Sequence, residues 1–249
     1  MRLFLIPDTY KGGDSLVLVE SDYHYLIRVL RYKAGYEFPG RDSKGNVFDL
    51  KITDISDDRC ILEVKKSVTD YFRLPEIVLY QCVCKGKKMD QIIRQATEAG
   101  VSKIIPVVSD FLVSKFDTGK SSKIERWNKI IREAIQQSGS RVNTLIGNSV
   151  TIDELGEIDD SVGDIGLFFH QEALDSGSLH RYLGSGSGKV LLVVGPEGGL
   201  SDRETDILFE KKFSSVYLKT NILRAETAAV YVIGAVQTIL LESANWILK

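Results

Sequence analysis

Hydrophobic spacing divides the chain into two parts with different periodicity. In the first seventy residues, short apolar runs bounded by polar residues or glycine predict strands at Arg2–Ile6, Leu16–Val19, Val47–Ile55 and Cys60–Val64. One helix interrupts them, with Ser21 or Asp22 as its cap and an apolar stripe of Tyr25, Leu26, Val29 and Leu30. This pattern predicts a small β-barrel-like domain.

From Glu76 onward, predicted strands alternate with predicted helices. The strands cover Ile77–Val83, Ile104–Val108, Ile165–Phe169, Val190–Val194 and Val216–Leu218. Helical spacing marks one helix from Met89 to Ala99, ended by Gly100, and another from Ile124 to Ile135. Ser201 and Glu204 give the capping-box pattern for a helix over Ser201–Lys211. The alternation predicts an α/β domain with a parallel sheet, joined to the first domain by a linker at Asp70–Pro75.

The last predicted helix, from Ala225 to Trp246, is apolar nearly all round. A helix without a polar face is buried on most of its sides. Burial inside one chain is one explanation, and an interface between two copies is the other. A domain of this size favours the interface, so we expect a homodimer, which a glutamate at Val232 or Val236 should separate.

The composition is that of an ordinary globular protein, with 43% hydrophobic residues and a formal net charge of −2 over 249 residues. The three cysteines form no C-x-x-C pair and the three histidines are scattered, so we expect no metal site. No apolar run reaches the roughly 18 residues of a membrane span. The apolar stretch after Met1 is too short for a signal peptide, so a cytoplasmic location and no membrane partner are expected.

Charge is distributed unevenly along the chain. Lys85, Lys87, Lys88 and Arg94 stand against the single acid Asp90 across ten residues. A local basic face on a slightly acidic protein suits specific contact with RNA more than bulk binding of nucleic acid.

A glycine-rich loop, Gly195-Pro196-Glu197-Gly198-Gly199-Leu200, leaves a predicted strand and enters the capped helix. Glycines allow positive φ and close approach of a ligand to the backbone, and we expect Gly198 to have this conformation. The alternative is a turn that binds nothing. The loop is not a dinucleotide fingerprint, because G-x-G-x-x-G is absent.

A second segment, Asn221–Ala228, also leaves a strand and enters a helix. Glu226 and Thr227 fit ordinary helix-start chemistry, but the positive charge of Arg224 is poorly placed beside a helix N-terminus. An arginine in such a position usually has a carboxylate, a phosphate or a ligand as its partner.

These two segments, Val193–Leu200 followed by Leu223–Ala228, resemble the ribosomal RNA small-subunit methyltransferase E family of the SPOUT superfamily. Further stretches resemble the same family in order and spacing: His24–Arg31, Lys85–Asp90 with Glu98, Gly100 and Pro106, and Glu133-Ala134 with Gln136–Ser138 and Arg141. This chain has Asn221 where the family commonly has a basic residue, and Lys219 where it has glycine. The turn near Phe38–Asp42 is also looser than the family's.

The resemblance implies an α/β fold: a C-terminal SPOUT domain (residues 73–249) with a parallel sheet and a deep trefoil knot, and a PUA-like RNA-binding domain (residues 1–72). It implies a homodimer that methylates N3 of a uridine in 16S rRNA, free or in the small ribosomal subunit, with S-adenosyl-L-methionine as methyl donor. The implied catalytic residues are Arg224 and Glu226. The implied cofactor-binding residues are His170, Glu172, Gly195, Pro196, Glu197, Gly198, Gly199, Leu218, Leu223, Thr227 and Ala228. The RNA-binding residues are expected to be His24, Arg28, Arg31, Lys85, Lys87, Lys88, Arg94 and Arg141.

Two other functions stay open at this level. One is a SPOUT enzyme that methylates the ribose 2′-oxygen, and the other is a non-catalytic PUA-like RNA-binding protein. The intact Gly195–Gly199 and Arg224–Thr227 segments favour an active enzyme.

Overall fold

The computed structural model describes residues 3–67, 75–112, 121–174, 177–184 and 188–245. The chain divides into two compact units, which we describe separately. The first contains residues 1–72 and Ile135–Asn143, and the second contains Arg73–Ala134 and Thr144–Lys249. Most of the predicted linker lies outside the described residues.

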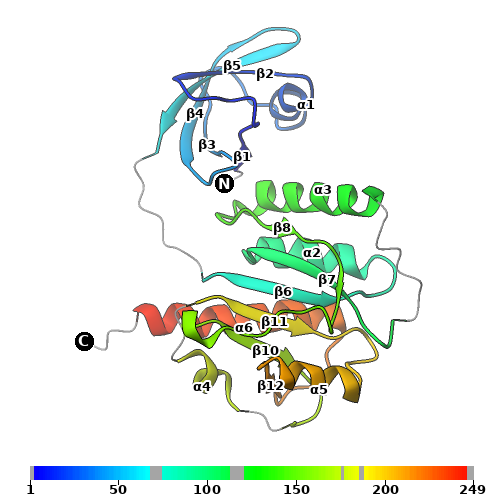
Figure 1. Cartoon of the computed structure of the whole chain (residues 1–249). Helices are drawn as coiled ribbons and strands as arrows, with labels where there is room; N and C mark the ends of the chain where they lie inside the picture. The colour runs from blue at the N-terminus through cyan, green and yellow to red at the C-terminus, as the bar shows by residue number, and fades with distance from the viewer. Residues whose placement is uncertain (1–2, 68–74, 113–120, 175–176, 185–187, 246–249) are drawn as a thin grey trace. The chain divides into compact units, whose positions relative to one another are not determined.

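The first unit contains one five-stranded sheet curled around a single core (Figure 1). Its strands are β1 (Phe4–Leu5), β2 (Ser15–Val19), β3 (Glu37–Arg41), β4 (Val47–Ile55) and β5 (Arg59–Lys66), in the order β1-β3-β4-β5-β2. All neighbours are antiparallel except β1 and β3. Alternate side chains such as Leu50, Ile52 and Leu62 are fully buried, which confirms the period-two pattern of the predicted strands.

Strand β3 was not predicted, because Pro39 and Gly40 lie in it and both are uncommon in strands. Gly40 is needed here for close approach. A Cβ added to it would lie 2.4 Å from Cδ1 of Leu50, the residue at the centre of the core. The glycine therefore belongs to the packing of β3 against β4.

The helix of the first unit differs from the prediction in its cap and its stripe. It begins as α1 (Glu20–Tyr23) after Val19, with no side-chain cap, and continues as the π-helix η1 (His24–Val29). The amide of Leu30 donates to the carbonyl of Tyr25 at 2.9 Å, a wide turn that rotates later side chains around the helix axis. Val29 is consequently 56% exposed, so its assignment to the buried stripe was wrong.

Arg41 is the most deeply buried charged side chain of the first unit, at 1% exposure. Its guanidinium donates to the carbonyl oxygens of Ser140 (2.7 Å) and Val142 (3.2 Å) and to Oδ1 of Asn143 (2.6 Å). Burial lowers the pKa of Arg41 to about 10, which still leaves it charged at neutral pH. The side chain therefore fastens the 140–143 segment within this unit.

The second unit contains a parallel sheet, as predicted from the strand–helix alternation. Its strands are β6 (Ile77–Cys82), β7 (Lys103–Val108), β8 (Leu145–Ile146), β9 (Val150–Thr151), β10 (Ile165–Phe169), β11 (Val190–Val194) and β12 (Ser214–Val216). The order is β12-β10-β11-β6-β7-β8, with β9 also paired to β7. The predicted strand Val216–Leu218 is displaced, because β12 ends at Val216 and the chain then enters a loop.

The helices of this unit are α2 (Lys88–Glu98), α3 (Ser121–Ser138), α4 (Leu179–Leu183), α5 (Asp202–Glu210) and α6 (Ala225–Asn245), with a 3-10 turn η2 (Asp160–Val162). The last four residues of α3 group with the first unit. Gly100 follows α2 with φ +80°. The Ser201–Glu204 capping box is present in full, which confirms the predicted start of α5.

Helix α6 runs beside β11 and packs against α2 and α4 (Figure 1). Val232, Ile233 and Val236 on its inner side are at most 1% exposed, whereas Tyr231 on the other side is 49% exposed. Within one chain the helix is therefore covered mainly on its inner side, so burial inside a monomer does not account for its composition, and the homodimer stays a prediction. Val232 and Val236 belong to the core rather than to an outer face. Only 28% of the stretch Ala225–Glu242 is buried, so apolar surface stays uncovered.

By length and composition alone, the same stretch of α6 could cross a membrane, and no other helix among the described residues could. Its inner side is part of the core of the second unit, where the Gln237 amide also donates to the carbonyl of Ala99. We therefore treat α6 as a core helix with one open side.

Candidate functional site

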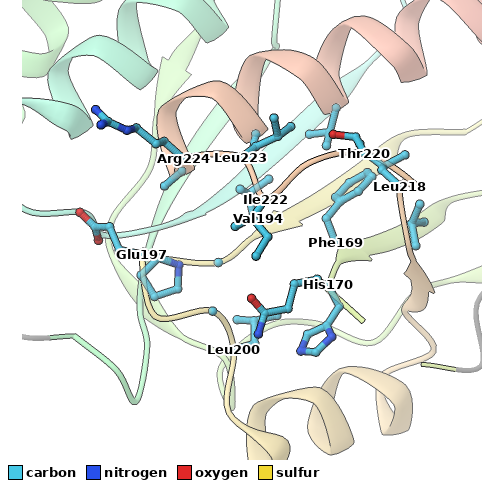
Figure 2. Close-up of a pocket in the computed structure, with 18 of the residues that line it drawn as sticks. Phe169, His170, Val194, Glu197, Leu200, Leu218, Thr220, Ile222, Leu223 and Arg224 are labelled. Atoms are coloured by element: carbon cyan, nitrogen blue, oxygen red, sulfur yellow. The ribbon is translucent and has the colours of Figure 1, made fainter. Parts of the chain in front are cut away.

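A cavity of about 640 Å³ lies at the carboxyl ends of three adjacent strands, β12, β10 and β11. The loop that follows each strand contributes to its wall, and the start of α6 closes one side (Figure 2). This edge of a parallel sheet is where such folds bind ligands. The sequence had singled out two of these loops by their unusual residues, and the structure brings them together.

The glycine-rich loop after β11 bends back on itself. A Cβ on Gly195 would lie 3.3 Å from the carbonyl carbon of Gly199, and the amide of Gly199 donates to the carbonyl of Pro196 at 3.0 Å. Gly199, with φ +75°, adopts the left-handed conformation. The expectation that Gly198 would do so was wrong, since the turn falls one residue later.

The buried carboxylate of Glu204 holds this loop to the segment that follows β7. It is 1% exposed and accepts from the amides of Ser201 (2.9 Å) and Asp110 (3.0 Å). The Asp110 carboxylate in turn accepts from Ser201 Oγ at 2.6 Å and from Arg203. Two loops from distant parts of the sequence are thereby fixed against each other.

The loop after β12 forms the mouth of the cavity. Ile222 is 88% exposed there, and Arg224 is exposed at the last position before α6. The carbonyl of Arg224 accepts from the amides of Thr227 and Ala228, which opens the helix. Among the described residues, no side chain or backbone group pairs with the Arg224 guanidinium. In Figure 2, Arg224 and Glu197 lie on the same side of the cavity, and His170 lies across from them.

Glu197 and Lys88 form an ion pair of 2.8 Å in the cavity wall. Burial acts to raise the pKa of the Glu197 carboxyl, but the hydrogen bond and charge of Lys88 outweigh it and leave the pKa below its usual range. The pKa of Lys88 is raised, mainly by its hydrogen bond to Glu197 and further by the charges of Glu197 and Glu226. Glu226 has a buried carboxylate oxygen without a partner among the described residues.

Most of the predicted cofactor residues line this cavity. Those that do are His170, Gly195, Pro196, Glu197, Gly199, Leu218, Leu223 and Ala228. Glu172, Gly198 and Thr227 lie outside its wall, and the amide of Glu172 donates to Nδ1 of His170 at 3.1 Å. Arg224 lines the mouth, and Glu226 sits behind it with no hydrogen bond to Arg224.

The predicted RNA-binding residues fall into two groups, one in each unit. His24, Arg28, Arg31 and Arg141 are exposed in the first unit, where Arg28 also lies 6.0 Å from the ring of Tyr23. Lys85, Lys87 and Arg94 are exposed around the start of α2, and Arg94 lies 3.9 Å from Glu133. Lys88 differs from the others because its ammonium is paired within the cavity wall.

Sequence reasoning missed several wall residues that come from the strands themselves. Phe169, Val216 and Tyr217 lie at strand ends, and Val232 reaches the cavity from the first turns of α6. Apolar residues at these places look like core. The available signal was positional, since side chains at the carboxyl ends of neighbouring parallel strands meet at one edge.

Comparison with known proteins agrees with this architecture. A model described as an RNA methyltransferase domain matches residues 72–237, and one described as an RNA methyltransferase PUA domain matches residues 20–65. Ribosomal RNA small subunit methyltransferase E of Aquifex aeolicus is 33% identical over 225 residues, 90% of this chain and 94% of that protein. Its namesake in Synechocystis is 28% identical, covering 96% of this chain and 78% of its own length.

A crystal structure of the Neisseria gonorrhoeae protein with the same name, bound to S-adenosyl methionine, superposes with a TM-score of 0.84. It is 26% identical and covers 96% of this chain and 98% of its own. The matches span both units, include the loops that form the cavity, and reach from the N-terminal sheet to α6. This chain belongs to the ribosomal RNA small subunit methyltransferase E family.

Proposed function

We propose that this protein transfers a methyl group from S-adenosyl-L-methionine to N3 of a uridine in 16S rRNA of the small ribosomal subunit. The observation that carries the proposal is the cavity at the ends of β10, β11 and β12, with unpaired Arg224 at its mouth. Family membership supports the reaction class, and the cofactor-bound Neisseria relative supports the methyl donor.

The cavity suits the cofactor in shape and chemistry. A side chain at Gly195 would press against Gly199, and the space beside Gly199 is open, so a ligand can lie against the backbone of this loop. Val194, Leu200 and Leu218 offer apolar contact for a purine ring, and His170 and Gln171 offer polar groups for a ribose or an amino acid moiety. When bound there, the cofactor supplies an electrophilic methyl group.

The chain's own contribution is to hold the base and manage its proton. N3 of uridine carries a weakly acidic proton, and its loss places negative charge on the neighbouring carbonyl oxygens. Arg224 is placed to stabilise that charge from the mouth of the cavity. Glu226, in the first turn of α6, has a carboxylate oxygen without a partner among the described residues and is our candidate for accepting the proton.

We assign RNA binding to residues 1–72 and methyl transfer to residues 73–249, with phosphate contacts in both. His24, Arg28, Arg31 and Arg141 would act in the first unit, and Lys85, Lys87 and Arg94 in the second.

Each lost phosphate contact lowers the log–log salt slope of binding by about 0.7 to 0.9. Arg28→Gln with Arg31→Gln, or Lys85→Gln with Lys87→Gln, should flatten the slope and leave cofactor affinity unchanged. A slope that stays the same in both double variants would place the RNA elsewhere.

We further propose a homodimer through the outer side of α6, where Tyr231 is 49% exposed and Ala235 and Ile239, one and two turns further on, are partly exposed. Tyr231→Glu with Ala235→Glu should yield monomers by light scattering with weakened cofactor binding, because an unpaired buried charge is costly. Val162→Glu, at a residue of η2 that is 57% exposed, is the control and should stay dimeric. A wild type that is monomeric at micromolar concentration yet fully active would contradict this interface.

The trefoil knot and the cytoplasmic location stay predictions.

Nucleoside analysis of small-subunit RNA treated with the enzyme tests the reaction itself. The expected product is N3-methyluridine at one position. Ribose 2′-O-methylation would support the other SPOUT chemistry instead. If no methylated nucleoside forms and calorimetry detects no cofactor binding, the protein is a non-catalytic RNA binder.

A further inference from the structure

A second cavity, of about 650 Å³, adjoins the first and has no role in the function described so far. Lys88 and Glu197 line both cavities, so their ion pair is the shared wall. The other side chains around the second cavity are Lys85, Asp110, Phe111 and Leu112, with Gly198 at its floor. Because the same two side chains line both cavities, a ligand in the second cavity would be a neighbour of a ligand in the first.

Phe111 is the feature of this cavity that ordinary packing does not explain. Its ring is 48% exposed, although a large aromatic side chain is usually buried. Gly198 makes room for it, because a Cβ on that glycine would lie 3.2 Å from Cβ of Phe111. The exposed ring therefore rests on the glycine-rich loop.

The backbone beneath Phe111 is held in place from both sides. The amide of Asp110 donates to buried Glu204, and the Asp110 carboxylate accepts from Ser201 and from two nitrogens of Arg203 at 3.0 and 2.7 Å. The amide of Leu112 donates to the carbonyl of Ser109 at 3.0 Å. Because the backbone is already fixed, a ligand that binds the ring loses little free energy in ordering this segment.

The surroundings of the ring suit a flat ligand with electron-rich oxygens. Two lysines and two carboxylates line the cavity, but Glu197 is paired with Lys88 and Asp110 with Arg203. The ammonium of Lys85 is therefore the charge available to attract the carbonyl oxygens of a base or an adjacent phosphate. RNA-binding proteins recognise unpaired bases by stacking them on aromatic side chains, and an enzyme that modifies a base must hold it out of its stack. A site for phosphate alone would have no use for the phenyl ring.

We propose that this second cavity receives an unpaired base of the RNA beside the target uridine and that Phe111 is the surface on which that base stacks. The proposal rests on the function given above and deepens it. It also gives Lys88 a different place from the phosphate contact expected from the sequence, since Lys88 lines both cavities and its ammonium is paired with Glu197. Gly198 then serves the base-binding cavity rather than the cofactor cavity.

The test compares variants of Phe111 in methylation of small-subunit RNA. Removal of a stacking ring weakens base binding by about 5- to 140-fold, so kcat/KM for RNA should fall by that factor in Phe111→Ala. Phe111→Leu should fall almost as far, because it keeps apolar bulk but no π face, and Phe111→Tyr should keep most of the activity. Phe209→Leu, at another exposed phenylalanine of the same unit, is the matched control and should have normal kcat/KM.

Two further measurements separate stacking from a structural role. Cofactor affinity by calorimetry should be the same in wild type and Phe111→Ala. In Phe111→Trp, RNA carrying the target uridine should quench fluorescence more than in the wild type, whose only tryptophans are Trp127 and Trp246. Unchanged kcat/KM in Phe111→Ala, or loss of cofactor affinity in that variant, would overturn this inference and leave the proposed function standing. A wild type that does not methylate small-subunit RNA would overturn the proposed function and this inference with it.

Discussion

Two arginines, one in each unit, show what burial does to the same side chain. Arg41 is 1% exposed, and three oxygens from the 140–143 segment accept its hydrogen bonds. Arg224 is exposed at the mouth of the cavity formed by the loops after β10, β11 and β12, and it has no partner among the described residues. A buried cation with acceptors around it stabilises the fold, whereas an exposed one beside a cavity is available to a ligand.

The comparison also shows why sequence reasoning found one arginine and missed the other. Arg224 attracted notice because a positive charge precedes a helix, which local electrostatics disfavours. Arg41 lies in a strand that was not predicted, and its partners are about a hundred residues away in sequence. Local chemistry can reveal an unsatisfied residue, but a satisfied one depends on contacts that only folding brings together.

The largest expected effect in this comparison comes from Arg224→Ala. Loss of one group that stabilises developing negative charge costs about 100- to 1,000-fold in kcat. Thermal stability should be unchanged, because the side chain has no partner in the fold. Steady-state kinetics on small-subunit RNA and a melting curve check both statements. Arg224→Lys, which keeps the charge without the planar fork, should recover part of the loss; near-normal turnover in Arg224→Ala would remove the assigned role.

Arg41→Met should show the opposite pattern. The substitution keeps the apolar stem but leaves the carbonyls of Ser140 and Val142 and the side chain of Asn143 without their donor. We expect the free energy of unfolding to fall by about 2 to 3 kcal/mol, measured by denaturant titration. Cofactor affinity of the folded protein should stay the same. An unchanged free energy of unfolding would mean that the hydrogen bonds of Arg41 to the 140–143 segment do not stabilise the fold.

Gly199→Val tests whether cofactor binding depends on the backbone conformation of the glycine-rich loop after β11. A β-branched residue at φ +75° costs about 1 to 2 kcal/mol, so we expect cofactor affinity to weaken by about tenfold. Gly45, with φ +87° and open space around it in the first unit, provides the matched control. Gly45→Val should suffer similar strain and bind the cofactor normally. Equal cofactor affinity in both variants would mean that the loop after β11 is only a turn.

The smallest effect is expected at Arg203, whose side chain is half exposed and paired with Asp110 and Asp153. Because solvent screens such pairs, Arg203→Gln should lower the free energy of unfolding by less than about 1 kcal/mol. Hydrogen bonds from Arg203 and Ser201 hold the pKa of Asp110 below its usual range. The pair's contribution is therefore present above the ordinary carboxyl pKa and is lost as pH falls through the lowered value. Acid titration of unfolding should show this loss in the wild type and a weaker one in Arg203→Gln.

Much of the fold was predictable because the spacing of apolar residues along a strand or helix decides which side chains face the core. The strands Val47–Ile55, Ile165–Phe169 and Val190–Val194 and the capped start of α5 lie where the sequence predicted them. Strand β3 was missed because Pro39 and Gly40 are poor strand formers, and their place depends on packing against β4. The predicted buried face of the first helix was wrong at Val29, because the helix continues as a π-helix there. No residue preference along the sequence indicates such a turn.

For the site, the sequence by itself determined which loops are unusual: a glycine-rich turn before a capped helix, and an arginine at a helix start. Those are local properties, since positive φ and helix-end charges act within a few residues. Only the tertiary structure decided that the loops after β10, β11 and β12 share one cavity, that Lys88 pairs with Glu197 in its wall, and that Phe111 stands exposed beside it. These features join residues up to about a hundred positions apart, and the parallel sheet brings them together by aligning the carboxyl ends of its strands at one edge.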